Sequence, residues 1–220
     1  ILTISIWDDQ IRLSLIGKTL QTIAHQTFNL TIVEDDDGVR SVDPYEITYF
    51  IRSGIQSMQV EHSVSIDSMG IAAMPGYLVA WNKETCRPVT NCYLPNNTLS
   101  KSVFQEFKFS SFYSMFRDGH ETIIDGAPNV ALNLWVISRK LASKKDPHLV
   151  VSSVDTWINY FMTGCNELAF VASPSLVSEL CFSSDAWDEP LLSTLGFNPS
   201  HFPLIREKQV LQTKDFPPLD

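Results

Sequence analysis

The chain of 220 residues lacks the features of a membrane protein and of a nucleic-acid-binding protein. None of its apolar runs reaches the roughly 18 residues that a membrane-spanning helix needs. Lys and Arg number 16 against 25 Asp and Glu, so the net charge is -9. Nucleic-acid affinity depends on cationic side chains that release counterions from phosphates. We therefore expect no membrane span and no nucleic-acid partner.

The cysteines lack the spacing of a zinc site. Cys86, Cys92, Cys165 and Cys181 contain no C-x-x-C pair and have no neighbouring histidine pair, so we expect no metal site. In the absence of a secretory signal, the pattern predicts reduced thiols. We therefore expect an intracellular protein in the cytoplasm, with mitochondrial association as the alternative.

Sequence motifs of common enzyme classes are also missing. The chain has no G-x-S-x-G elbow for a nucleophilic serine and no G-x-x-x-x-G-K-[ST] phosphate loop. The histidines are scattered. The acidic run at residues 34–37 lacks the further oxygen ligands, at defined offsets, of a cation site. Because Gly38 follows it, the run predicts a solvated turn.

Apolar periodicity predicts the secondary structure. Residues 2–7, 11–16 and 20–25 alternate, as expected for a meander of three antiparallel strands. Asp43, Pro44 and Glu46 form a capping-box-like start for a helix. Further strands are predicted at residues 66–73, 77–81, 89–94 and 149–151, and further helices at 103–116, 128–141, 154–164 and 187–195, before an irregular tail from 198. Meander strands followed by alternating strands and helices indicate one α/β domain with a mixed sheet covered by helices.

Three stretches then occur in a fixed order: GVRSVDPYEI at residues 38–47, GI at 70–71 followed by VAWNKETCRP at 79–88, and SVDTW at 153–157 followed by MTG at 162–164. They resemble the G-W-x-E-x-D-P-x-x-I, G-I…V-W-x-K-x-T-G-x-P and G-T-V-D-T-W-L…L-T-G segments of glycerol kinases and of the wider FGGY carbohydrate kinase family. WD at 187–188 and LGFNP at 195–199 extend the resemblance over nearly the whole chain.

The resemblance implies a ribonuclease-H-like α/β domain of the actin and sugar-kinase superfold, with a mixed sheet flanked by helices. Family members carry a second such domain, and their ATP lies between the two. Much of the nucleotide site and the catalytic base come from that second domain. We expect residues 1–220 to form the amino-terminal kinase-like domain only, without the second one.

At the family's phosphate-binding hairpin, this sequence has lost the characteristic residues. Family members carry D-x-G-T-T/S there, in which glycine permits a tight turn and small hydroxyls with backbone amides cradle phosphate. Asp8 and Asp9 occupy the corresponding place, and the glycine and both hydroxyls are gone. The resemblance makes these two residues a candidate residual phosphate or Mg²⁺ site, with a solvated hairpin turn as the alternative.

The family's substrate positions also fall on side chains that cannot bind a polyol. The N-Q-R-E motif, whose Arg and Glu bind glycerol hydroxyls, aligns with AMPG and so places Pro75 and Gly76 there. The aromatic wall aligns with Pro95, the substrate tyrosine with Ala127, and the acid of a T-D motif with Ala172. A site built on paired polar groups cannot orient a substrate without them.

The SVDTW stretch is retained, and we interpret it as structural. Asp155 is expected to cap the helix that begins there, and Thr156 and Trp157 are expected to pack against the sheet.

Two hypotheses follow. The first is a glycerol-kinase-like pseudokinase domain with no catalytic residue and no cofactor, acting as a binding or structural component of a larger assembly, with a protein partner and a homo- or hetero-oligomeric state. The alternative is the first half of an active ATP-dependent carbohydrate kinase, which uses ATP and Mg²⁺ and for which Asp8, Asp9 and Asn96 are the candidate contacts. Actin-like assembly has only fold-level analogy behind it.

Overall fold

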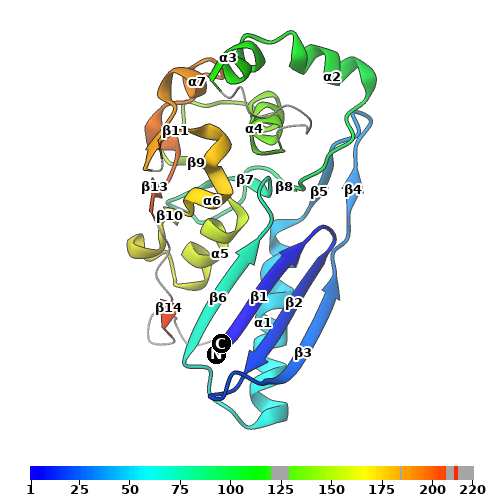
Figure 1. The fold of residues 1–220 in the computed structure, drawn as a ribbon, viewed down its shortest axis with the longest axis vertical. Coiled ribbons are helices and arrows are strands. Elements are labelled where there is room, and N and C mark those ends of the chain that lie inside the picture. The colour runs from blue at the N-terminus through cyan, green and yellow to red at the C-terminus, as the bar shows by residue number, and fades with distance from the viewer. Residues whose placement is uncertain (120–128, 184, 207–210, 213–220) are drawn as a thin grey trace.

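A computed structural model describes residues 1–119, 129–183, 185–206 and 211–212 of the chain (Figure 1). The strands are β1 Leu2–Trp7, β2 Gln10–Ile16, β3 Thr22–Asn29, β4 Val33–Glu34, β5 Arg40–Val42, β6 Ser68–Ala73, β7 Leu78–Asn82, β8 Cys92–Tyr93, β9 Leu149–Ser153, β10 Val171–Ala172, β11 Cys181–Ser183, β12 Ala186–Trp187, β13 Leu204–Ile205 and β14 Leu211–Gln212. The helices are α1 Pro44–His62, α2 Lys101–Lys108, α3 Ser111–Gly119, α4 Asn129–Lys140, α5 Val154–Met162, α6 Pro174–Val177 and α7 Glu189–Ser193, with 3-10 turns η1 Glu167–Ala169, η2 Ser178–Leu180 and η3 Pro199–His201.

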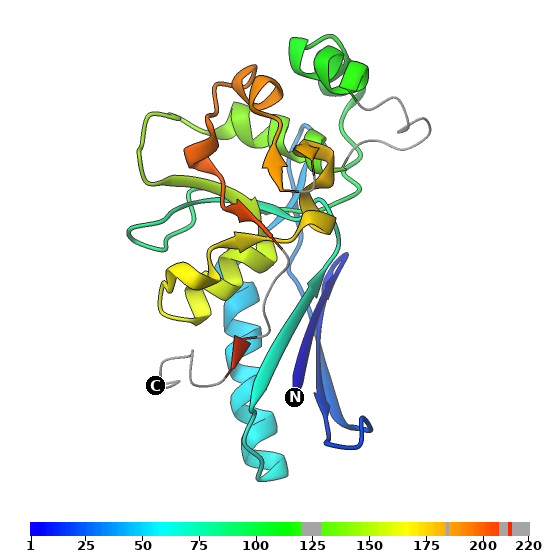
Figure 2. The ribbon, with the colours of Figure 1, turned by 60° about the vertical axis from the view of Figure 1, so that its left-hand side comes forward.

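The first five-stranded sheet has the order β14-β6-β1-β2-β3. Strands β1, β2 and β3 form the predicted antiparallel meander, and β6 runs parallel to β1, so the sheet is mixed. Alternate residues of β1 and β2 are buried on the side that α1 covers, while the opposite face has no described helix on it (Figure 2). Gly54 allows α1 to pack closely, because a Cβ there would lie 2.2 Å from Leu13 Cδ1.

The second five-stranded sheet has the order β4-β5-β8-β7-β9. One core lies between the first sheet, α1, α5 and one face of the second sheet, with the fully buried Trp81 of β7 and Trp157 of α5 in it. A second core gathers the side chains of α2, α3, α4 and α7. The α/β class with a mixed sheet and flanking helices is therefore confirmed.

Several local predictions need correction. The helix expected over residues 103–116 is two helices, because Ser110 interrupts it: its Oγ donates to Phe107 O at 2.6 Å and accepts from Tyr113 N at 3.1 Å. The capping box of α1 is only half formed. Asp43 caps Tyr45 N at 2.8 Å, but Glu46 binds Thr31 instead.

The acidic run at residues 34–37 leads from the end of β4 into the predicted turn, which is anchored rather than simply solvated. Lys140, at the end of α4, lies 2.9 Å from Asp35 and 3.4 Å from Asp37. Partial burial opposes ionisation of Asp35, but the Lys140 hydrogen bond and the backbone N–H of Val39 outweigh it and lower the pKa of Asp35. Through these ion pairs, the turn after β4 is anchored to α4.

Of the described helices, none has the length and apolar character to cross a membrane.

Candidate functional site

The tight turn between β1 and β2 holds Asp8 and Asp9. Asp8 has a left-handed backbone with φ of 46°, and its side chain is 59% exposed. The Nη1 atom of Arg40 lies 3.5 Å from Asp8 Oδ1, and the Tyr77 hydroxyl donates to the Asp8 carbonyl. A guanidinium beside Asp8 disfavours a second cation there. Among the described residues, no group of three or more His, Cys, Asp or Glu is arranged to hold a metal ion.

The turn between β6 and β7 holds Pro75 and Gly76. Pro75 is exposed, whereas Gly76 is buried and has φ of +101°. A Cβ on Gly76 would lie 2.9 Å from Asn129 Cβ and 3.1 Å from Pro95 Cβ. The structure therefore brings Gly76 and Pro95 together, and the space between them is filled by backbone and ring atoms.

We predict that Gly76→Ala lowers the free energy of unfolding by about 1–3 kcal/mol, because the added Cβ meets two neighbours and a left-handed backbone disfavours alanine. Gly70→Ala is the matched control. A Cβ on Gly70 meets nothing within 4 Å, so the same change there should stay within about 0.5 kcal/mol. Urea unfolding of both variants measures the difference, and equal losses would contradict the close packing of Gly76 against Asn129 and Pro95.

Asn133 of α4 binds both the turn at Gly76 and the loop after β8 that begins at Leu94. Its side chain is almost fully buried. Its Nδ2 donates to Gly76 O at 2.6 Å and to Leu94 O at 2.7 Å, and its Oδ1 accepts from Asn97 Nδ2 at 2.8 Å. The Oδ1 of Asn97 in turn accepts from Arg40 N at 2.6 Å. The side chain of Arg40 reaches Asp8, so this network links the β1–β2 hairpin to the turn at Gly76 and the loop after β8.

Asn96 and Asn129 form a hydrogen-bonded pair that is more exposed to solvent than this network. Asn96 N donates to Asn129 Oδ1 at 3.0 Å, and Asn129 Nδ2 donates to Asn96 Oδ1 at 3.3 Å. The sequence singled out only Asn96 of these asparagines. The asparagines belong to two segments that lie more than 30 residues apart in the sequence, and no local motif marks Asn97, Asn129 or Asn133.

The amino end of α4 is capped by an acid. The Oε2 atom of Glu179, in η2, accepts from Val130 N at 2.9 Å and from Ala131 N at 3.0 Å. Free amides at a helix start attract phosphate, but here a carboxylate occupies two of them. Ala127, the expected replacement of the substrate tyrosine, lies outside the described residues.

The SVDTW stretch begins α5, but Asp155 does not cap it. The N-cap position is Ser153, and Asp155 is buried within the first turn, where a negative charge is favoured by the helix dipole. Thr156 is fully buried and donates to Val171 O at 2.8 Å. Ala172, which the sequence placed at the family's acid, is fully buried in β10.

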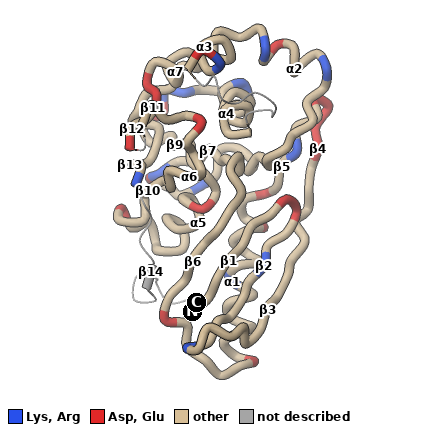
Figure 3. Tube along the Cα trace, viewed as in Figure 1, with Lys and Arg blue, Asp and Glu red and all other residues tan. Residues whose placement is uncertain are grey.

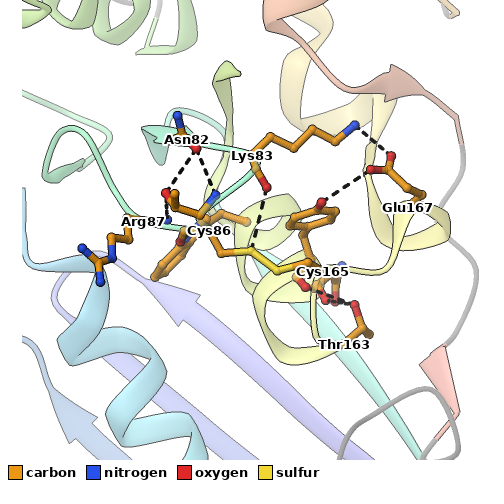
Figure 4. The surroundings of a disulfide bond; sticks show 11 residues. Asn82, Lys83, Cys86, Arg87, Thr163, Cys165 and Glu167 are labelled. Carbon is orange, nitrogen blue, oxygen red and sulfur yellow. Dashed lines mark hydrogen bonds and ion pairs between the residues drawn. A yellow bond between two sulfur atoms is a disulfide. The ribbon is translucent and has the colours of Figure 1, made fainter. Parts of the chain in front are cut away.

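A disulfide joins Cys86, in the turn after β7, to Cys165, just after α5 (Figure 4). The prediction of four reduced thiols is therefore wrong for this pair, while Cys92 and Cys181 are free. The fold brings the two cysteines together. Trp157 of α5 donates through Nε1 to Cys86 O at 3.4 Å, which holds the turn after β7 beside α5. The expected intracellular location rested on reduced thiols, and this bond removes that support.

Comparison with known proteins places this arrangement in one family. Residues 1–213 match the N-terminal domain of the FGGY family of carbohydrate kinases. A glycerol kinase from Vibrio parahaemolyticus is 23% identical over 167 residues, covering 74% of this chain and 32% of that protein. One from Shewanella piezotolerans is 26% identical and covers 68% and 31%. The chain thus spans about a third of the length of these relatives.

Solved structures show the same fold. The structure of Plasmodium falciparum glycerol kinase with ADP superposes with a TM-score of 0.78 at 18% identity, covering 93% of this chain and 42% of that one. A ligand-bound xylulose kinase from Lactobacillus acidophilus gives 0.72 at 15% identity, covering 94% and 42%. The expected superfold and the family resemblance are therefore confirmed. The chain belongs to the FGGY family of carbohydrate kinases and corresponds to its N-terminal domain.

Proposed function

We propose that this domain is a pseudokinase that binds neither glycerol nor ATP in the manner of a kinase and serves as a binding or structural component of a larger assembly. The contact of Gly76 with Pro95 is the observation that carries the proposal. We further propose that residues 1–220 contain only the amino-terminal kinase-like domain.

The packing around Gly76 argues against a polyol site. Recognition of a polyol requires side chains that donate to and accept from its hydroxyl groups. Neither Gly76 nor Pro95 supplies one, and the carbonyl of Gly76 is already bound by Asn133. A longer polar side chain at residue 76 would collide with Asn129, so the turn would have to move to house it.

Electrostatics argue against a phosphate site. The turn at Asp8 and Asp9 contains no glycine, serine or threonine, and Glu179 occupies amides at the start of α4. The net charge of -9 adds a general repulsion for a nucleotide. Arg40 lies beside the hairpin, and it is already paired with Asp8.

One observation favours the alternative of an active carbohydrate kinase. Asn96 and Asn129 present amide groups at the exposed side of the same site, and an amide can both donate and accept. On this alternative, Asn96 would contact a substrate unlike glycerol, Asp8 and Asp9 would hold Mg²⁺, and a second domain would complete the ATP site.

Calorimetry separates the two functions. Titration of the chain, and of any longer protein that contains it, with glycerol and with ATP plus Mg²⁺ is expected to give no binding heat. Vibrio parahaemolyticus glycerol kinase serves as the positive control under the same conditions. Micromolar binding of either ligand would overturn the pseudokinase proposal. Binding of ATP without glycerol would favour the alternative.

A further inference from the structure

Strand β3 is the outer edge of the first sheet. It pairs with β2 on one side, and no described strand pairs with its other side (Figure 1). It is 8 residues long. An edge strand of this length presents a row of N–H and C=O groups that can form a ladder with another strand.

The register identifies the groups that face outward. Ile1 and Ile16 exchange backbone hydrogen bonds of 2.8 and 3.0 Å. The N–H and C=O groups of every second residue of β2, counted from Ile16, therefore point to β1, and those of the residues between them point to β3. The residues of β3 that bond to β2 are therefore Ala24, Gln26 and Phe28. The outward groups belong to the alternate residues of the strand: Ile23, His25, Thr27 and Asn29.

This edge lacks the features with which proteins block edge pairing. Natural edges carry lysine, proline or inward charges, or are kept short. Residues 20–33 contain no Lys, Arg, Asp, Glu, Pro or Gly, although 19% of the whole chain is charged. Strand β3 accordingly carries neither blue nor red in Figure 3. The whole chain has a net charge of -9, so two copies repel each other. Because residues 20–33 carry no Asp, Glu, Lys or Arg, contact through this segment adds no direct charge repulsion.

We propose that β3 pairs antiparallel with β3 of a second copy of this chain, which joins the two sheets into one across a two-fold axis. With the axis at Gln26, the outward groups of His25 face those of Thr27 of the partner subunit, and both form hydrogen-bonded pairs. On the α1 side, the large Phe28 faces the small Ala24 of the partner subunit. The register is self-complementary, as a two-fold interface requires.

The α1 side of the edge is already held in place. Phe28 stacks on Phe50 of α1 with ring centroids 5.0 Å apart, and Gln26 Nε2 donates to Ser57 Oγ at 3.0 Å. Because these side chains are already held in place, they lose little conformational entropy when a second strand pairs with β3, which lowers the cost of association. This pairing does not depend on the loss of the polyol site.

The test is the mass of the chain in solution. Light scattering with size exclusion is expected to give twice the chain mass of 24.8 kDa, falling to 24.8 kDa on dilution. Thr27→Lys places like charges near one another across the axis, and Thr27→Pro removes an outward donor that the monomer does not use. Both should yield monomers at the concentration where the natural chain is dimeric. Ser114→Lys, on exposed α3, carries the same charge change and should remain dimeric.

Hydrogen exchange of the peptide over residues 20–33 gives the second readout. Its amides should exchange more slowly as the concentration of the natural chain rises, and at a constant rate in Thr27→Lys. Circular dichroism verifies that the variant is folded, so that if Thr27→Pro fails to fold, Thr27→Lys decides. A natural chain that is monomeric at every concentration would overturn the proposal. A dimer that survives Thr27→Lys, or is lost equally in Ser114→Lys, would overturn it too.

Discussion

Replacing Cys86 or Cys165 with serine is expected to lower the free energy of unfolding by about 2–4 kcal/mol, or roughly 5–15 °C in Tm for a chain of this size. The two residues are 79 positions apart. Their bond therefore closes a long loop, and its removal returns that chain entropy to the unfolded state. Because either replacement breaks the same bond, the double variant should lose no more than the larger single loss.

Cys181→Ser is the matched control. Cys181 is a free, partly buried cysteine whose Sγ donates to Val177 O, and serine keeps that donor. Thermal unfolding in the absence of reductant should show a small shift for Cys181→Ser and a large one for Cys86→Ser. Thiol titration of the unfolded, unreduced protein should detect the thiols of Cys92 and Cys181 alone. Four reactive thiols would contradict the bond.

Reduction should loosen the contact between the turn after β7 and the segment after α5. Lys83 and Glu167 form an ion pair of 2.8 Å beside the disulfide (Figure 4). Lys83 Nζ also lies 4.0 Å from the centre of the Phe170 ring. These contacts link the same turn after β7 to the same segment after α5. Exposed ion pairs contribute about 0–1 kcal/mol, so they cannot replace the disulfide.

Local sequence signals predicted the part of the fold that local interactions determine. Alternation in residues 2–7 and 11–16 became β1 and β2, because one face of each strand is buried under α1. Asp43 and Pro44 located the start of α1 within one residue, because a cap needs only its own helix. The break at Ser110 is not predicted because the apolar spacing continues through it, and the hydroxyl bonds of Ser110 leave no mark in that spacing.

Contacts between distant segments could not be predicted in the same way. Cysteine spacing indicates a bond only when the partners lie close in the sequence, and Cys86 and Cys165 do not. The family resemblance named Gly76 and Pro95 separately, but their contact depends on how two turns meet. Asn133 lies in the middle of an apolar helix, and only the fold supplies the two carbonyl groups that it binds.

The second large effect is expected at Asn133. We predict that Asn133→Leu, which is similar in volume, lowers the free energy of unfolding by about 2–4 kcal/mol, because it leaves Gly76 O buried without its donor. Leu94 O retains a hydrogen bond of 2.9 Å from Asn97 Nδ2, so the loss should come mainly from Gly76. Asn133→Asp should lose more, since a buried carboxylate would face both carbonyl oxygens.

Asn129→Ala tests whether burial decides the size of the effect. Asn129 carries the same amide on the same helix, but its bonds to Asn96 are exposed to solvent, which can replace them. Its loss should stay below about 1 kcal/mol. Urea unfolding should show Asn133→Asp as the most destabilised variant, followed by Asn133→Leu and then by Asn129→Ala. If Asn133→Leu were no worse than Asn129→Ala, the turn at Gly76 would not need Asn133, and the packed site that supports the pseudokinase proposal would lose its anchor.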